Sequence, residues 1–417
     1  MRFREFHRNI KIRIAETFLS RFAGGMIFPF MTIYLASHFG ARTAGLLLLI
    51  NVGAGIAVSF IGGYLSDTYG RKKIMAGAET ARLAAYIIML ISNSPLYQAP
   101  LITFFMMTVN SISWGLSGPA NQAMLIDVST PEQRRLMYSV TYWANNLSIA
   151  IGGILGGFLF KDYLFELFMA LVLLEIAVVW MVIFLMEESH AGSVRKIAPA
   201  EHIFQLIASY KTVVKDHLFI RFVLAGVLIS SMEFQLTNYT GIRLSNVMES
   251  QYFFSWKIDG LAMMGFLRSE NTILVVIMVL FASKWSSIFN DKTTLIISCF
   301  LFTIGYGVLS YSTDIWVLVL FMVILTIGEV FRVPVEQSYT ASIPPENARS
   351  AYMAVKGLNY NLAMLIASLT VTLGSFVPPL FMTVLITSAG LIGILIYSKI
   401  IPGLEDRKTH MEAGKSM

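Results

Sequence analysis

Several acidic side chains lie inside or at the ends of long apolar stretches of this sequence. Glu233 and Glu329 are near the middle of two such stretches, and Asp67 and Asp127 stand where two others end. An ionisable side chain in hydrocarbon costs roughly 2.5–3.5 kcal/mol on insertion scales, so its presence indicates a function. A carboxyl group loads a proton more readily when a closed cavity removes its water, and it releases the proton when water returns. We therefore predict that these four residues serve proton coupling or conformational change.

Two of these acids also have structural alternatives. Glu329 could form an ion pair with Arg332, which follows three residues later on the same helix face. Asp127 follows an apolar helix end and precedes Pro131, which holds it at the membrane boundary, and it could instead be an N-cap or a solvated loop acid. The residue types alone leave these alternatives open.

The composition is that of an integral membrane protein. The chain has 417 residues, of which 56% are hydrophobic and 13% are charged, whereas a soluble domain carries roughly 25% charged residues. Its single cysteine, Cys299, excludes a disulfide within the chain and a cysteine metal site. The net charge of +6 comes from Lys and Arg in loops. Loop cations determine membrane topology, so we expect no nucleic-acid partner.

Apolar runs of about 20 residues are long enough to cross a hydrocarbon core of roughly 30 Å. The sequence predicts about twelve such helices, at about 14–36, 43–65, 74–91, from the turn at 94–100 to 126, 137–160, 164–186, 218–243, 260–282, 294–309, 315–341, 351–376 and 379–400. The loops that would be cytoplasmic all carry Lys or Arg, and the outer loops carry few. We therefore expect a multi-pass protein of the plasma membrane with both termini in the cytoplasm.

The chain also repeats itself at about half its length. Pro119-Ala120-Asn121-Gln122 recurs as Pro334-Val335-Glu336-Gln337. A long polar stretch separates the two copies. The sequence thus predicts a first six-helix half over 1–186, a cytoplasmic linker over 187–217, and a second six-helix half with a cytoplasmic tail over 218–417.

The cationic turn between the second and third expected helices has a specific sequence, Gly62-Gly63-Tyr64-Leu65-Ser66-Asp67-Thr68-Tyr69-Gly70-Arg71-Lys72-Lys73. It resembles the signature of the major facilitator superfamily, which it matches at Gly63, Leu65, Asp67, Gly70, Arg71 and Lys72. Thr68 stands where that family usually has a cation. The resemblance implies an all-α integral membrane fold of twelve transmembrane helices in two pseudo-symmetric halves, with the substrate site where the halves meet.

The resemblance also implies which helices contact substrate. Helices 1, 4, 7 and 10 line the cavity in that fold. The implied cavity residues of this chain on helices 4, 7 and 10 are Asn110, Trp114, Glu233, Glu329 and Arg332. Glu175 falls in helix 6, which is peripheral in the same fold, so we expect a packing role for it.

The fifth expected helix contains closely spaced glycines, Gly152, Gly153, Gly156 and Gly157. This run resembles the Gly-Pro-x-x-Gly-Gly motif of proton-coupled drug antiporters, with Gly153 in place of the proline. Glycines at this spacing also let two helices approach closely. The motif therefore fits both a coupling role and plain helix packing.

The pairing of Asp127 with the later Tyr142-Trp143 resembles the multidrug/proton antiporter branch of the superfamily, of the kind found in lactococci. The likeness implies conformational or proton-coupling roles for Asp67 and Asp127, and a cavity role for Glu329. Those relatives have an aspartate where this chain has Thr141. This departure leaves open its coupling network and its preference for cationic drugs.

These features predict a secondary transporter, not an enzyme, that exports lipophilic or cationic compounds in exchange for protons by alternating access. We expect a bacterial protein that acts as a monomer among membrane lipids, with no cofactor and no metal. Three alternatives remain: an uptake symporter for a small polar metabolite, a lipid flippase of the same fold, and a membrane sensor that transports nothing.

Overall fold

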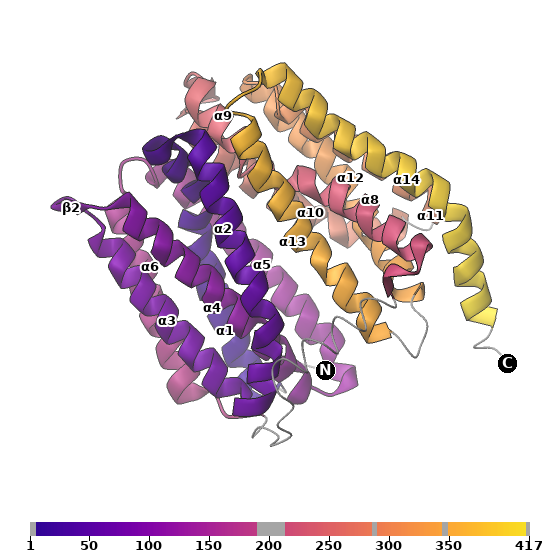
Figure 1. Cartoon of the computed structure of the whole chain (residues 1–417), viewed down its shortest axis with the longest axis horizontal. Helices are drawn as coiled ribbons and strands as arrows, with labels where there is room; N and C mark the ends of the chain where they lie inside the picture. The colour runs from indigo at the N-terminus through magenta and orange to yellow at the C-terminus, as the bar shows by residue number, and fades with distance from the viewer. Residues whose placement is uncertain (1–5, 190–212, 286–289, 344–348, 414–417) are drawn as a thin grey trace. The chain divides into compact units, whose positions relative to one another are not determined.

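A computed structural model describes residues 6–189, 213–285, 290–343 and 349–413. The chain divides into two compact units, residues 1–203 and 204–417. Figure 1 shows both units as bundles of long helices, the first in indigo to magenta and the second in pink to yellow.

The first unit consists of helices joined by short turns and one small hairpin. Its elements are α1 (Arg8–Ile27), the 3-10 turn η2 (Phe28–Phe30), α2 (Met31–Tyr69), α3 (Arg71–Ile91), β1 (Asn93–Ser94), β2 (Tyr97–Gln98), α4 (Pro100–Asp127), α5 (Pro131–Leu159), α6 (Leu164–Trp180) and the π-helical turn η3 (Met181–Leu185). Strands β1 and β2 pair antiparallel. Helix α4 packs on α2 and α3, while α1 packs on α5 and α6, and α3 also contacts α6. Helices α1, α3 and α4 thus each pack against at least two other helices.

The first two expected spans are present but begin and end differently. Pro29 lies in η2, which interrupts the helical path of the first span because proline supplies no N–H for an α-helical hydrogen bond. The next helix continues past the expected boundary and leaves helical geometry at Gly40, where φ is 77° and ψ is 153°. A positive φ is readily adopted by glycine, so this residue makes the turn between the two spans.

The second unit has the same general construction. Its elements are α8 (His217–Glu233), α9 (Tyr239–Val247), β3 (Gln251–Phe253), β4 (Trp256–Ile258), α10 (Gly260–Trp285), α11 (Asp291–Leu309), α12 (Ile315–Ser342), α13 (Arg349–Leu373) and α14 (Pro379–Ala413). Strands β3 and β4 form an antiparallel hairpin. Helix α12 packs on α10 and α11, and α8 packs on α13 and α14.

The expectation of one continuous helix over 218–243 is wrong. The helix ends at Glu233 and resumes at Tyr239. Between them, the Asn238 side-chain amide donates to the carbonyl of Phe234 at 2.8 Å. Side-chain amides that bond nearby carbonyls compete with the helical pattern, which apolar content alone does not reveal.

Two helices, α5 and α14, extend beyond their apolar segments into polar residues. Helix α5 begins at Pro131, about a turn and a half before the apolar run, because the Thr130 and Gln133 side chains form a capping box. Helix α14 continues from the apolar segment through the polar residues up to Ala413. Hydropathy therefore locates the membrane segment of a helix and not its ends.

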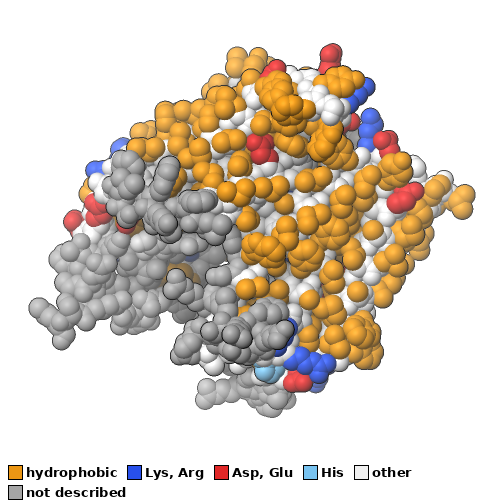
Figure 2. Space-filling view, turned by 180° about the vertical axis from the view of Figure 1, so that it is seen from behind, with side chains coloured by type: hydrophobic (Ala, Val, Ile, Leu, Met, Phe, Trp, Pro, Cys, Tyr) orange, Lys and Arg blue, Asp and Glu red, His pale blue; other side chains and the backbone are white. Residues whose placement is uncertain are grey.

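The surface of the described residues is largely apolar. Figure 2 shows hydrophobic side chains over most of the visible described face, with charged side chains mainly near its margins. Large apolar residues such as Leu173, Phe184 and Leu395 are more than half exposed. Seven helical stretches of the described residues are long and apolar enough to cross a membrane, one of which, 8–66, includes both α1 and most of α2. Such a surface suits contact with lipid.

Candidate functional site

The signature turn is built around Gly70. This residue has φ of 101° and separates the last residue of α2, Tyr69, from the first of α3, Arg71. A residue with a Cβ is strained at this backbone angle. The tight turn expected from the sequence is therefore present, and it places Arg71 at the start of α3.

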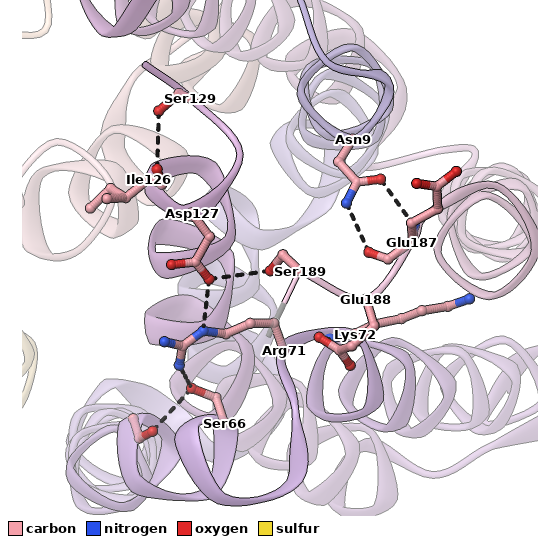
Figure 3. Close-up of polar contacts among 11 residues, drawn as sticks. Asn9, Ser66, Arg71, Lys72, Ile126, Asp127, Ser129, Glu187, Glu188 and Ser189 are labelled. Atoms are coloured by element: carbon pink, nitrogen blue, oxygen red, sulfur yellow. Dashed lines mark hydrogen bonds and ion pairs between the residues drawn. The ribbon is translucent and has the colours of Figure 1, made fainter. Parts of the chain in front are cut away.

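Arg71 contacts the ends of two neighbouring helices (Figure 3). Its guanidinium Nε lies 3.3 Å from Asp127 Oδ2 at the end of α4. Its Nη1 donates at 2.8 Å to the hydroxyl of Ser66, which belongs to the last turn of α2. The arginine side chain is 11% exposed and that of Asp127 29%. Asp127 is thus an ion-pair partner of the signature turn. The side chain of Asp67 lies outside what the structure describes.

The residues after η3 fold back onto the same end of the unit, as Figure 3 shows. Ser189 donates its hydroxyl to Asp127 Oδ2 at 3.2 Å. The Glu188 carboxylate accepts from the backbone N–H of Lys72 at 3.1 and 3.2 Å. This N–H belongs to the first turn of α3, where helical N–H groups have no partner in the helix and attract negative charge. Of the expected linker, residues 190–212 lie outside the described residues.

Asn9 connects the start of α1 to the same segment. Its side-chain amide donates to the Glu187 carbonyl at 2.8 Å, and its side-chain oxygen accepts from the Glu187 N–H at 3.0 Å. The first and last helical elements of the unit are therefore joined at the end that carries the Gly70 turn.

A buried charged group in the first unit was not singled out by its sequence. Arg82 of α3 contacts Glu79 through both terminal nitrogens, at 2.7 and 3.2 Å. Its Nη1 also lies 3.9 Å from Glu175 Oε1 on α6. All three residues are 1% exposed. The sequence signal was present, because an acid and a base three residues apart in an apolar helix can only be neutralised by such contacts.

Two expected cavity residues of α4 lie beside this charged group. The guanidinium of Arg82 is 4.5 Å from the centre of the Trp114 ring, and that of Arg21 is 5.1 Å from it. Asn110, which is 5% exposed, accepts a hydrogen bond from the hydroxyl of Tyr86 at 3.0 Å. A cation over an aromatic face is attracted by the ring quadrupole. A change in the charges of Arg82, Glu79 and Glu175 would therefore alter the contact between the guanidinium of Arg82 and the Trp114 ring.

In the second unit, Glu329 lies near the middle of α12. Its carboxylate accepts a hydrogen bond from the Asn271 side-chain amide of α10 at 2.8 Å. The same amide also donates to the hydroxyl of Thr326 at 3.0 Å. A neutral amide therefore holds Glu329 in place.

Arg332 does not pair with Glu329 as the sequence allowed. It is 4% exposed and bonds instead to Glu336 at 2.8 Å, one turn further along α12. The other oxygen of Glu336 accepts from Lys356 of α13 at 2.5 Å. In the sequence, Glu336 stands out only as part of the internal repeat. Its spacing from Arg332 allows an ion pair, as does that of Glu329, so the sequence alone does not choose between the two acids.

Glu233 is the last residue of α8, and its side chain is exposed. The helix break follows it directly, since the next helix begins only at Tyr239. Glu233 and Glu329 are nonetheless close enough to interact electrostatically. The second unit thus brings these two expected acids into one region.

The glycines of α5 contact α1. A Cβ on Gly152 would lie 2.6 Å from the carbonyl oxygen of Phe22, and one on Gly156 would overlap the carbonyl of Met26. Gly153 and Gly157 are also buried. The packing role of this motif is therefore present in the structure. In the signature, Gly63 has only an ordinary contact with Pro119.

Thr141, which takes the place of an aspartate in the antiporter branch, bonds within its own helix. Its hydroxyl donates to the Met137 carbonyl at 2.9 Å. In this chain the position therefore supplies no carboxylate to the coupling network.

The comparisons with known proteins agree on the fold. Residues 17–368 match the family model described as Major Facilitator Superfamily. A protein described as a Na(+), Li(+), K(+)/H(+) antiporter from Planococcus maritimus is 27% identical over 383 residues, which are 89% of this chain and 90% of that protein. The multidrug resistance protein MdtH of Yersinia enterocolitica is 21% identical over 345 residues, covering 81% of this chain and 79% of the relative.

Solved transporters have similar structures at low sequence identity. A POT family transporter in complex with 5-aminolevulinic acid superposes with a TM-score of 0.76 at 16% identity, covering 96% of each chain. The nucleoside transporter NupG superposes with a TM-score of 0.70 at 12% identity, covering 94% of this chain and 100% of that chain. At this identity the likeness concerns the fold alone.

Proposed function

The chain belongs to the major facilitator superfamily, and from this premise we propose that it is an antiporter that exports lipophilic or cationic compounds in exchange for protons. Its fold of twelve membrane helices in two halves is that of a secondary transporter. In the proposal, the cytoplasmic membrane holds the protein with both termini inside, and the working unit is a monomer. The family relation to the multidrug protein MdtH supports the substrate class.

The environment of Glu329 is the observation that carries the proposal. Its carboxylate lies in an apolar helix and contacts the neutral amide of Asn271, while the nearby Arg332 is bonded to Glu336. A carboxylate positioned in this way can take either a proton or a cationic substrate as its positive partner. Competition between the two for one group is sufficient for exchange, because binding of one then requires release of the other.

Replacing Glu329 tests this role. Glu329→Gln keeps the hydrogen-bonding side chain but removes the charge. We expect it to weaken binding of ethidium, a lipophilic cation, by roughly ten-fold or more, which corresponds to about 1.4 kcal/mol. Binding by the variant should no longer change between about pH 5 and pH 8, because the competing proton has lost its site.

Ethidium fluorescence with purified protein measures this binding. Glu249→Gln is a suitable control, since Glu249 is an exposed acid outside the helices of the second unit, and it should bind as the parent does. A stable Glu329→Gln protein whose binding still follows pH like the parent's contradicts the role of Glu329.

A second candidate is exchange of monovalent metal cations for protons. The Planococcus maritimus relative is described as a Na(+), Li(+), K(+)/H(+) antiporter and covers nearly the whole chain. Carboxylate and amide oxygens, as at Glu329 and Asn271, are also groups that hard cations prefer.

Everted membrane vesicles distinguish the two candidates. A pre-formed proton gradient should collapse on addition of ethidium if the substrate is a lipophilic cation, and on addition of sodium, lithium or potassium chloride if it is a metal cation. Choline chloride controls for salt. A gradient that responds to none of these favours the uptake, flippase or sensor alternatives.

A further inference from the structure

Two buried carboxylates of the first unit share one guanidinium. Arg82 Nη1 lies 2.7 Å from Glu79 Oε2 and 3.9 Å from Glu175 Oε1. Both carboxyl groups thus lie at the same guanidinium nitrogen, where Glu79 and Glu175 also interact with each other. Neither of the two oxygens that face Arg82 Nη1 receives a hydrogen bond from a described residue.

The charges around this pair do not balance inside the protein. Helix α1 contributes the ion pair of Arg13 with Glu16, which is neutral as a unit and buried. Helix α3 contributes Arg82 and Glu79, and α6 contributes Glu175. With every carboxylate ionised, the buried residues named here carry three negative charges and two positive ones.

The other groups near the pair do not remove this excess. Arg21 of α1 is exposed, unlike the five buried residues counted above, and its guanidinium is placed over the Trp114 ring. Tyr86 of α3 is a neutral phenol that donates to Asn110 of α4. A buried charge without compensation costs several kcal/mol. One more positive charge is therefore required among these carboxylates.

We propose that Glu79 and Glu175 hold one proton between them, which makes a second proton site in the first unit, apart from Glu329. A proton satisfies both requirements at once. It removes the excess negative charge, and it supplies the O–H donor that two facing carboxyl oxygens lack. Loss of this proton leaves a second carboxylate charge beside Arg82 and draws the guanidinium away from Glu79 towards Glu175.

This site acts on the substrate-binding candidates of α4. Arg82 stacks on Trp114 at 4.5 Å and also donates to Ser20 of α1 at 3.1 Å. Movement of the guanidinium between the two carboxylates therefore changes the position of the indole ring and the contact with α1. Proton release at the Glu79–Glu175 pair is in this way transmitted by a single side chain to Trp114, which is an expected cavity residue.

Infrared difference spectroscopy of the purified protein tests the site without any transport. A protonated carboxyl group absorbs in a region separate from the carboxylate, and the band shifts in deuterium oxide. At neutral pH we expect the parent to show a carboxylic acid band that Glu175→Gln loses. Glu166→Gln, which removes an exposed acid in the first turn of the same helix, should keep it.

Glu175→Gln should also remain folded, because the glutamine leaves Arg82 and Glu79 as a neutral pair. Glu79→Gln is the second variant and should lose the same band. The proposal is wrong if Glu175→Gln and Glu79→Gln both retain the carboxylic acid band of the parent. It is also wrong if the parent protein shows no such band, whether the buffer cation is sodium or choline. This result is separate from the ethidium measurement on Glu329, so either proposal can fail alone.

Discussion

At the scale of single residues, Asp127 contacts the signature turn directly. It pairs with Arg71 and accepts from Ser189, so three segments of the first unit meet at one carboxylate. A partly exposed ion pair contributes roughly 0–1 kcal/mol to folding. Its larger effect is expected on the conformational equilibrium, where such a contact exists in one state and is broken in another.

Asp127→Asn and Arg71→Gln should therefore impair transport alike. Each is expected to slow proton-driven ethidium efflux several-fold, with little change in melting temperature. The double variant should be no slower than either single one, since residues that act through one contact are not additive. Efflux from vesicles measures this, and Asp162→Asn, an exposed acid between α5 and α6, is the control. Additive losses would show that the two residues act independently.

Asp216 predicts an acid-sensitive contribution to stability. Burial alone would raise the pKa of this carboxyl group, but hydrogen bonds from Tyr352, from Arg407 and from the N–H of Phe219 outweigh it, and the pKa is lowered. The carboxylate accepts from the Tyr352 hydroxyl at 2.8 Å and from Arg407 at 2.7 Å. A lowered pKa means that the stabilisation is present above the unfolded-state pKa of about 3.9 and is lost as pH falls towards the native value.

Thermal unfolding of the purified protein, measured from about pH 7 down to about pH 3, checks this. Asp216→Asn should lower the melting temperature at neutral pH and should flatten its decline in acid, because the titrating group is gone. Asp259→Asn provides a comparison at an acid that caps α10 through its bond to Ala262. An unchanged acid slope in Asp216→Asn would contradict the assignment.

At the scale of helices, the contact of α1 with α5 depends on the absence of side chains. A Cβ on Gly156 would overlap the Met26 carbonyl and the Phe30 ring, and these atoms belong to the opposing segment. Overpacking of a tight contact costs typically about 1–3 kcal/mol.

Gly156→Val should thus separate the two helices and lower the melting temperature or the amount of folded protein. Gly77→Val is the matched control, because Gly77 is also helical but has no atom within 4 Å of its would-be Cβ. Size-exclusion profiles and melting curves of both variants in detergent measure the difference. Equal behaviour of the two variants would show that the α1–α5 contact tolerates added volume.

The same scale shows what the sequence could predict. Apolar runs placed the helices well, and the glycine of the signature placed the turn at Gly70, because burial in lipid and backbone freedom are properties of local sequence. The ion-pair partner of Arg332 could not be predicted from local sequence in this way. Two acids, Glu329 and Glu336, lie one helical turn from it. Lys356 of α13 bonds to Glu336 together with Arg332, and the packing of α13 is not readable from the sequence of α12.

The pair of Glu79 and Glu175 was beyond the sequence for a similar reason. The two acids lie on α3 and α6, nearly one hundred residues apart, and only the packing of those helices brings them to one arginine. The break after Glu233 was missed because it depends on side-chain hydrogen bonds of Gln235 and Asn238 to preceding carbonyls, and apolar content does not report these.

At the scale of the whole molecule, the distribution of loop cations predicts how the chain crosses the membrane. The turn between β1 and β2 carries no Lys or Arg, and Leu96 within it is 97% exposed. The turn at Gly70 is followed by Arg71, Lys72 and Lys73. The first turn should face outward and the second the cytoplasm.

Cysteine labelling can check this, because Cys299 is the single cysteine of the sequence and is buried. In intact cells, a membrane-impermeant maleimide should label Leu96→Cys but neither Lys73→Cys nor the parent. In everted vesicles the labelling of the two variants should reverse. Labelling of Lys73→Cys from outside would invert the proposed topology.

Gly40 bears on how the chain enters the membrane during its synthesis. The helical backbone continues up to this residue and resumes directly after it, so the first two apolar segments are separated by a turn and not by an extended loop. During co-translational insertion, which starts at the N-terminus, these two segments would therefore enter the membrane as one helical hairpin. Cations flank this hairpin at both ends, at Arg8, Lys11 and Arg13 before it and at Arg71, Lys72 and Lys73 after it. Both ends would therefore stay in the cytoplasm together while the hairpin enters the membrane.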